Sequence, residues 1–176
     1  MNLPRKIVEV HRSLADAAIP HAFGGALALA WCTQRARGTI DIDLNLFLPP
    51  AAARDVLGAL PGGISWGDDD VARIERDGQV RLWWGDTPVD VFFSTTDFHV
   101  RASTRTRSEP FLDGELPFLA CRDLAVFKAF FNRTKDWADL EEMAAAGALD
   151  VEAVLGVLVR YVGGDDDRVE RLRALA

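Results

Sequence analysis

The segment Ile40-Asp41-Ile42-Asp43-Leu44-Asn45-Leu46 constrains the fold more than any other part of the chain. Apolar and polar residues alternate along it, and successive side chains of a strand point to opposite faces. We therefore predict a strand over residues 39–48 with one apolar face and one polar face that carries Asp41, Asp43 and Asn45. Carboxylates two positions apart lie roughly 7 Å apart at Cα and can share a pair of cations. A solvated polar face is the alternative interpretation.

The remaining periodicities predict an α+β protein. Helical spacing is expected over residues 4–18, 26–34, 51–60, 122–133, 136–146, 150–162 and 166–175. Strands are expected over residues 19–23, 39–48, 71–75, 80–84 and 89–94, the last three as an antiparallel meander, with a short extended segment over 116–120. Residues 101–107 are polar and basic and are predicted as a loop. We expect a core of mixed sheet and helices over residues 1–120, and a C-terminal helical region over residues 121–176 packed on it.

Composition excludes several classes of protein. The 176 residues suit about one domain, and 20 basic against 27 acidic residues give a net charge of −7. This charge argues against a protein that coats nucleic acid, and we expect no DNA partner. No apolar stretch reaches the ~18 residues that a membrane span needs, and no leader is evident, so we expect a cytoplasmic protein with no membrane partner. Cys32 and Cys121 lie in apolar runs, which argues against a disulfide framework, and a zinc site is not expected.

Two further features carry possible chemistry in the N-terminal part. Gly24-Gly25 separates a short apolar strand from an Ala-rich helix, where glycines let backbone N–H groups approach a phosphate. A tight turn is the alternative. Asp90 lies within the apolar run Val89–Phe93, and such an acid usually faces a site or a partner. The alternative is an edge-strand charge that discourages aggregation.

A third feature lies in the C-terminal part. Lys128, Lys135 and Asp139 are spaced at seven and four residues, so that one helical face could present them together. A solvated salt-bridge face is the alternative.

Together these segments resemble the nucleotidyltransferase superfamily. The resemblance rests on Gly24-Gly25, on Arg37-x-Thr39-x-Asp41-Ile-Asp43-Leu and on Val89-Asp90-Val91. A second motif, Asp123-Leu-(x)3-Lys128-(x)6-Lys135-Asp-(x)2-Asp139-Leu, is similar to AbiEii-type nucleotidyltransferase toxins, which include the MenT-type toxins of bacterial toxin–antitoxin systems. The resemblance covers about residues 19–140. Many superfamily members have Gly-Ser where this chain has Gly24-Gly25, so the nearest hydroxyl is that of Thr39, on the predicted acidic face.

The resemblance implies transfer of a nucleoside monophosphate from an NTP to a hydroxyl, with two Mg²⁺ ions. Asp41 and Asp43 are implied as metal ligands, and Asp90 as a metal ligand or the base. The implied nucleotide-binding residues are Gly24, Gly25, Thr39, Lys128, Lys135 and Asp139. Gly24 and Gly25 would cradle phosphates, and Lys128, also implied in catalysis, and Lys135 would neutralise the triphosphate. Asp139 would orient a lysine or the nucleotide.

For MenT-type relatives the acceptor is the 3′ end of tRNA, whose extension blocks aminoacylation and translation. The resemblance thus implies tRNA or another RNA as partner, together with a cognate antitoxin that in some systems is a kinase, with Thr39 as the expected phosphorylation site. The candidate RNA contacts are Arg101, Arg105 and Arg107, for which a solvated loop is the alternative. Two other functions stay open: transfer to a small molecule of the aminoglycoside type, and a degenerate module that only binds a partner.

Overall fold

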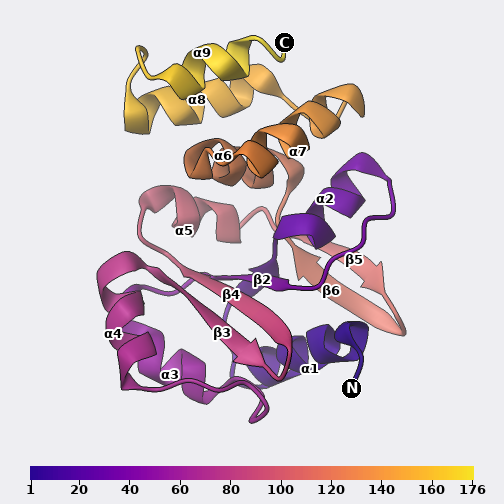
Figure 1. The fold of residues 1–176 in the computed structure, drawn as a ribbon, viewed down its shortest axis with the longest axis vertical. Coiled ribbons are helices and arrows are strands. Elements are labelled where there is room, and N and C mark those ends of the chain that lie inside the picture. The colour runs from indigo at the N-terminus through magenta and orange to yellow at the C-terminus, as the bar shows by residue number, and fades with distance from the viewer. The chain divides into compact units, whose positions relative to one another are not determined.

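The computed structural model describes residues 1–176, which divide into two compact units (Figure 1). Residues 1–26 and 38–119 form the first, here called the sheet unit. Residues 27–37 and 120–176 form the second, the helical unit. The predicted domains 1–120 and 121–176 stay a prediction. No helix is long and apolar enough to cross a membrane.

The sheet unit is built on one mixed six-stranded sheet in the order β3-β4-β2-β1-β6-β5. Its strands are β1 (His21–Phe23), β2 (Ile42–Leu46), β3 (Gln79–Trp84), β4 (Thr87–Phe93), β5 (Arg107–Phe111) and β6 (Gly114–Phe118). Strand β2 runs parallel to β4 and antiparallel to β1. The α+β class with a mixed sheet and flanking helices is therefore confirmed.

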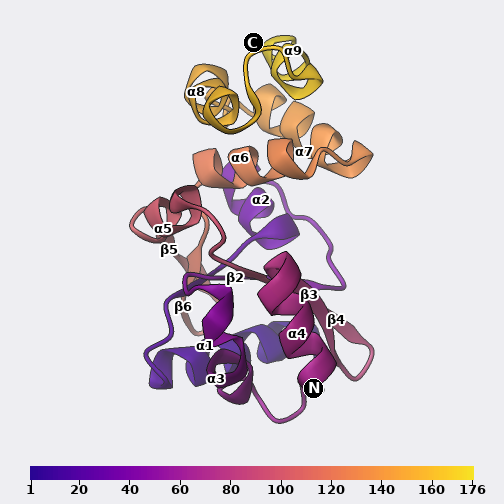
Figure 2. The ribbon, with the colours of Figure 1, turned by 90° about the vertical axis from the view of Figure 1, so that its left-hand side faces the viewer.

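Four α-helices accompany this sheet: α1 (Leu3–Asp16), α3 (Ala53–Gly58), α4 (Asp68–Asp77) and α5 (Asp97–Ser103). A short 3₁₀ helix, η1 (Pro50–Ala52), precedes α3. Both ribbon views show α1 and α3 below β2 (Figures 1 and 2). Helix α1 buries Ile7, Val10 and Leu14, which recur at the three- and four-residue spacing of one helix face.

Strand β2 has the predicted buried face but is shorter than predicted. Ile42, Leu44 and Leu46 are fully buried, whereas Ile40 is 78% exposed and precedes the strand. Pairing with β4 begins at Ile42↔Val89. The residue before Val89 is Pro88, which has no N–H to donate, so the ladder ends there and Asp41 stays outside it.

The predicted strand over residues 71–75 is wrong, because this segment belongs to helix α4. The Asp70 carboxylate accepts a hydrogen bond from the Gly67 N–H at the start of the helix (3.0 Å). Three aspartates in the first turn also favour the positive end of the helix dipole. Gly78 ends the helix with a φ of 72°, a conformation that glycine adopts readily. The expected meander is therefore a β3–β4 hairpin with β2 as its third partner.

The predicted loop over residues 101–107 is also largely wrong. Helix α5 extends to Ser103, and β5 begins at Arg107. The Thr96 side chain accepts a hydrogen bond from the His99 N–H at the start of α5, and Phe98 and Ala102 are buried. The polar composition of residues 101–107 therefore gave no sign of the short helix α5, in which only two side chains are buried.

The helical unit contains α6 (Cys121–Phe131), α7 (Thr134–Ala145), α8 (Val151–Val162) and α9 (Asp167–Arg173). Helix α2 (Gly25–Thr33) starts in the sheet unit and continues in the helical unit from Leu27. Asn132, with a φ of 56°, separates α6 from α7, and its side chain accepts a hydrogen bond from the Trp137 indole (2.7 Å). The turn between the two helices is therefore tied to a buried aromatic side chain.

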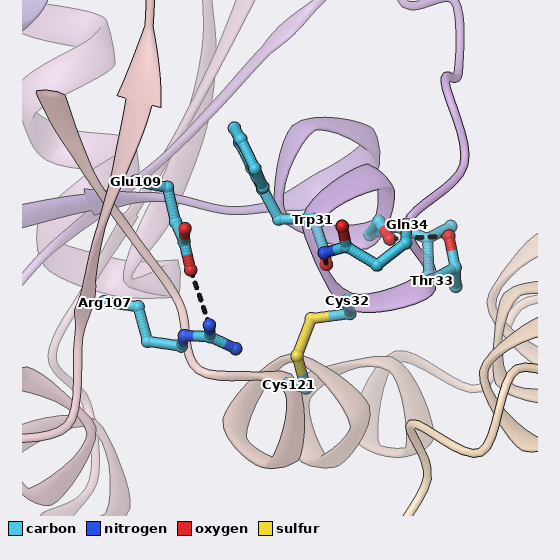
Figure 3. The surroundings of a disulfide bond; sticks show 8 residues. Trp31, Cys32, Thr33, Gln34, Arg107, Glu109 and Cys121 are labelled. Atoms are coloured by element: carbon cyan, nitrogen blue, oxygen red, sulfur yellow. Dashed lines mark hydrogen bonds and ion pairs between the residues drawn. A yellow bond between two sulfur atoms is a disulfide. The ribbon is translucent and has the colours of Figure 1, made fainter. Parts of the chain in front are cut away.

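Contrary to the sequence-based argument, Cys32 and Cys121 form a disulfide (Figure 3). The bond joins the end of α2 to the start of α6, with a sequence separation of 89 and 5.5 Å between the two Cα atoms. Apolar sequence surroundings gave no sign of this pairing, because the two cysteines meet only when α2 packs within the helical unit.

Candidate active site

Three charged residues lie side by side on neighbouring strands of the sheet unit. Asp43 of β2 is the register partner of Asp90 of β4, and Asp90 is the register partner of Arg81 of β3. Side chains of register partners share one face of a sheet, so the three side chains form a row across it. We call Asp43, Asp90 and Arg81 the charged row.

Two glycines bring the turn between β1 and α2 against this row. A Cβ added to Gly25 would lie 1.8 Å from Asp43 Oδ2, and the φ of Gly25 is +53°. A Cβ on Gly24 would lie 2.8 Å from Asn45 Nδ2. Only glycine permits the turn to pass this close to Asp43 and Asn45. Packing alone therefore explains the two glycines, and phosphate binding would be a second reason for them. The Gly24 N–H donates to the Asp43 carbonyl (2.9 Å), which leaves the N–H groups from Gly25 onward as the candidates for phosphate.

Asp41 lies just before β2, and its carboxylate contacts Thr39. The Thr39 hydroxyl donates to Asp41 Oδ1 (2.5 Å) and accepts the Asp41 N–H (3.3 Å). Both side chains are half-buried. Thr39 lies outside the strand, so its closeness to the acid comes from this local turn and not from the alternation of a strand.

Arg81 and Asp90 form a bidentate ion pair. Arg81 Nε donates to Asp90 Oδ1 and Arg81 Nη2 donates to Asp90 Oδ2, each over 2.7 Å. Hydrogen bonds and charge from Asp90 raise the pKa of Arg81, and the charges of Asp41 and Asp43 act in the same direction. The guanidinium thus lies within the electrostatic reach of all three candidate acids.

Arg81 is not among the residues that the motif resemblance implies. A signal for it exists in the sequence, because the two-residue turn Gly85-Asp86 fixes the register of the β3–β4 hairpin. Counting back from this turn places residue 81 opposite residue 90.

The acids of the charged row and the adjacent Asp41 are of a type that can bind a divalent cation. Asp41, Asp43 and Asp90 offer carboxylate oxygens, which Mg²⁺ prefers, and the Arg81 guanidinium contacts Asp90. No three side chains of His, Cys, Asp or Glu are grouped so as to hold a metal ion in this arrangement. The features that suit a divalent cation are therefore the carboxylate oxygens and their position on or beside neighbouring strands.

A second set of charges lies inside the helical unit. Lys128 Nζ donates to Asp139 Oδ2 (2.5 Å) and lies 3.9 Å from Asp136 Oδ1. Arg37 Nη1 lies 2.8 Å from Asp139 Oδ1 and 2.8 Å from Glu142 Oε2. The Lys128 and Asp139 side chains are only 7% and 8% exposed. These contacts form an ion-pair network in which Lys128, Asp136 and Asp139 are buried and Arg37 and Glu142 are partly exposed.

The predicted common helical face for Lys128, Lys135 and Asp139 is wrong. Lys128 belongs to α6, whereas Lys135 and Asp139 belong to α7. The turn at Asn132 brings Lys128 and Asp139 into contact, while Lys135 is exposed in the first turn of α7. The spacing of seven and four residues crosses a helix boundary and so does not describe one face.

The candidate RNA contacts have acidic or aromatic neighbours within the sheet unit. Arg101 pairs with Asp97 (2.8 Å), and Arg107 pairs with Glu109 (2.7 Å, Figure 3). The Arg105 guanidinium lies 6.0 Å from the centre of the Phe98 ring. Residues 101–107 lack acids of their own, but acids on either side of the segment pair with Arg101 and Arg107.

Comparison with known proteins links the fold to solved nucleotidyltransferases. No protein-family model and no curated protein matches the chain. The crystal structure of ANT(2″)-Ia in complex with adenylyl-2″-tobramycin is 14% identical, with a TM-score of 0.58 over 98% of each chain. The solution structure of the antibiotic-resistance factor ANT(2″)-Ia gives 13% identity and a TM-score of 0.55 over 90% of each chain.

A third solved structure gives a similar result. An antigenic nucleotidyltransferase-like protein from Paracoccidioides brasiliensis is 14% identical, with a TM-score of 0.52 over 96% of this chain and 92% of that one. At such identities the likeness concerns the fold alone. The chain has a nucleotidyltransferase fold.

Proposed function

We propose that the protein is a Mg²⁺-dependent nucleotidyltransferase whose site is the charged row together with Asp41. The observation that carries the proposal is the contact of the Gly24-Gly25 turn with Asp43, itself the register neighbour of Asp90. A glycine turn that opens a helix suits phosphate, and adjacent carboxylates suit a divalent cation. The nucleotidyltransferase fold supports this assignment.

In the proposed reaction the oxygen of an acceptor hydroxyl forms a bond to the α-phosphorus of an NTP. The bond from that phosphorus to the bridging oxygen breaks, and pyrophosphate leaves with the electron pair. Asp41 and Asp43 would hold Mg²⁺, which when bound stabilises the charge on the attacking and leaving oxygens. Asp90 would be a further metal ligand or would accept the hydroxyl proton on a carboxylate oxygen, and the N–H groups from Gly25 onward would bind phosphate oxygens. Lys135 is exposed and is proposed to contact the triphosphate.

For the acceptor we propose RNA, and specifically the 3′ end of tRNA. The two motifs that resemble AbiEii- and MenT-type toxins support this choice, and with it a cytoplasmic toxin that blocks aminoacylation and is controlled by a cognate antitoxin. Arg101, Arg105 and Arg107 are the proposed phosphate contacts, each of which would exchange its present neighbour for the RNA backbone.

Regulation by an antitoxin kinase is proposed to act at Thr39. Its hydroxyl contacts the Asp41 carboxylate, so a phosphate there would add about 1.5–2 negative charges beside the candidate acids. That charge would compete for the cation and repel the triphosphate. Replacement of Thr39 by Glu should block transfer, while Thr39→Ala should retain transfer and escape the antitoxin. An active Thr39→Glu protein would contradict the regulation.

A second candidate acceptor is a small polycation of the aminoglycoside type. The likeness to ANT(2″)-Ia over 98% of each chain supports it, as does a net charge of −7 that attracts cations. The ion pairs of Arg101 and Arg107 also reduce the positive charge available to RNA.

Transfer assays distinguish the candidates. The protein is incubated with Mg²⁺ and each α-labelled NTP, in parallel with total RNA and with a panel of aminoglycosides. Label on tRNA supports the toxin, and label on an aminoglycoside supports the second candidate. Label on neither acceptor would contradict both and favour a module that only binds a partner.

A further inference from the structure

The Arg81–Asp90 pair occupies both oxygens of a candidate metal ligand. Each Asp90 oxygen accepts one N–H of the same guanidinium over 2.7 Å. Bidentate contacts of this kind fix the orientation of a carboxylate and also neutralise its charge. A cation that approaches Asp90 therefore meets a carboxylate whose charge is already neutralised and whose near side is positive.

The same guanidinium interacts with the other acids. The charges of Asp41 and Asp43 both stabilise the protonated form of Arg81. One positive charge thus offsets part of the repulsion among three carboxylates. Without it, the three acids would repel one another more strongly and attract a divalent cation more strongly.

The Arg81 side chain is nevertheless placed so that it can move away from Asp90 into solvent. Strand β3 is at the edge of the sheet, and the Arg81 side chain is 50% exposed, against 18% for Asp90. Ion pairs with one partner this exposed contribute little to stability, because water solvates the released charge. The guanidinium can therefore move into solvent while the Asp90 side chain stays within the row.

We propose that Arg81 is a positioning residue that acts as an internal counter-cation for Asp90 and weakens divalent-cation binding until it is displaced. This inference rests on the proposed function, since it assumes that the acids beside Arg81 hold a cation. It adds a property that belongs to this chain's own sequence: Arg81 fixes the orientation of the Asp90 carboxylate, and a divalent ion must compete with Arg81 for it.

The test measures Mn²⁺ binding to the full-length protein without nucleotide, by titration calorimetry and by the electron paramagnetic resonance signal of free Mn²⁺. Arg81→Ala should bind Mn²⁺ about five-fold more tightly than the wild type, the factor expected for loss of one partly exposed competitor. Arg81→Lys keeps the charge but loses the two-pronged contact, so its affinity should lie between the two. Unchanged or weaker binding by Arg81→Ala would overturn the inference.

A matched control and a double substitution make the result specific. Arg76 forms a similar two-pronged pair with Asp77 on α4, outside the charged row, and Arg76→Ala should leave Mn²⁺ affinity unchanged. In an Asp90→Asn background, Arg81→Ala should tighten binding by clearly less than about five-fold, because the ion pair is then lost and only the longer-range effect on Asp41 and Asp43 remains. The full tightening in this background would contradict the proposed route.

Failure of the inference differs from failure of the proposed function. If the wild type binds Mn²⁺, loses it in Asp43→Asn, and shows no change in Arg81→Ala, only the role of Arg81 is wrong. If neither the wild type nor Arg81→Ala binds Mn²⁺, the metal site is wrong and the role of Arg81 is wrong with it.

Discussion

The Arg81–Asp90 pair of the sheet unit and the Lys128–Asp139 pair of the helical unit join the same kinds of charge but differ in burial. The Arg81 side chain is 50% exposed, whereas the Lys128 side chain is 7% exposed. A half-exposed partner can be exchanged for another cation at little cost, while a buried partner leaves an uncompensated charge when it is removed. The half-exposed Arg81 is therefore the partner that another cation can replace more easily, whereas removal of the buried Lys128 is expected to cost stability.

The largest expected effect is at Lys128. Lys128→Met removes the cation that the buried Asp139 and Asp136 share, while Arg37 still contacts Asp139 and Arg133 still contacts Asp136. It should lower the free energy of unfolding by about 3–4 kcal/mol, towards the lower end of the cost of breaking a buried ion pair. Lys135→Met is the matched control, because Lys135 is exposed, and it should change stability by less than about 0.5 kcal/mol. Urea denaturation measures both. A stable Lys128→Met protein that loses NTP affinity would instead support the nucleotide-binding role that the motif implies.

The disulfide gives the next largest effect, again in the helical unit. Replacement of Cys121 by Ser opens a bond that spans 89 residues of sequence, and should lower the free energy of unfolding by about 2–4 kcal/mol. Mn²⁺ binding at the charged row should persist, because neither cysteine belongs to the sheet unit. The oxidised and reduced wild type provide the control. Equal stability of the two forms would show that the bond does not contribute.

Acid should destabilise the protein through its three histidines, which all lie in the sheet unit and whose pKa values are lowered by burial. Burial lowers the pKa of His99 from 6.5 to about 4. Between these two values the unfolded chain binds a proton that the folded chain does not, so stability falls as the pH falls from 6.5 towards 4. The loss should be about 1–3 kcal/mol in urea denaturation across this range. His99→Gln should flatten this dependence, and an unchanged slope would contradict it.

The smallest effect on stability is expected for the exposed arginine pairs. Arg101→Ala and Arg107→Ala each break one ion pair whose arginine is about half exposed, and each should change the free energy of unfolding by less than about 1 kcal/mol. If these residues contact RNA, each substitution should also reduce the salt dependence of tRNA binding by about one phosphate contact. An unchanged salt dependence would remove them from the proposed RNA surface.

Local patterns predicted much of the fold because they depend on neighbouring residues. The alternation over Ile40–Leu46 predicted the buried face of β2, and helical periodicity predicted the C-terminal helices. The segment around Val71 failed because its capping residues, Gly67 and Gly78, lie outside the apolar run that suggested a strand. The residues at the two ends of this segment, and not those at its centre, therefore indicate that it is a helix.

The contacts of the candidate site depend on tertiary structure to different degrees. The Thr39–Asp41 contact is local, and the Arg81–Asp90 pair follows from the register of one hairpin. The Lys128–Asp139 contact required the helix boundary at Asn132, which spacing alone did not reveal. The disulfide joins positions 89 residues apart, and no local pattern specifies it.

The most direct test of the central claim measures transfer and stability together in Asp43→Asn and Asp139→Asn. We expect Asp43→Asn to lose transfer roughly a thousand-fold, equivalent to about 4 kcal/mol, with an unfolding free energy close to that of the wild type. Asp139→Asn should lose stability, because Lys128 and Arg37 then lack their shared carboxylate. Wild-type transfer by a folded Asp43→Asn protein would contradict the assignment of the charged row as the site of nucleotidyl transfer.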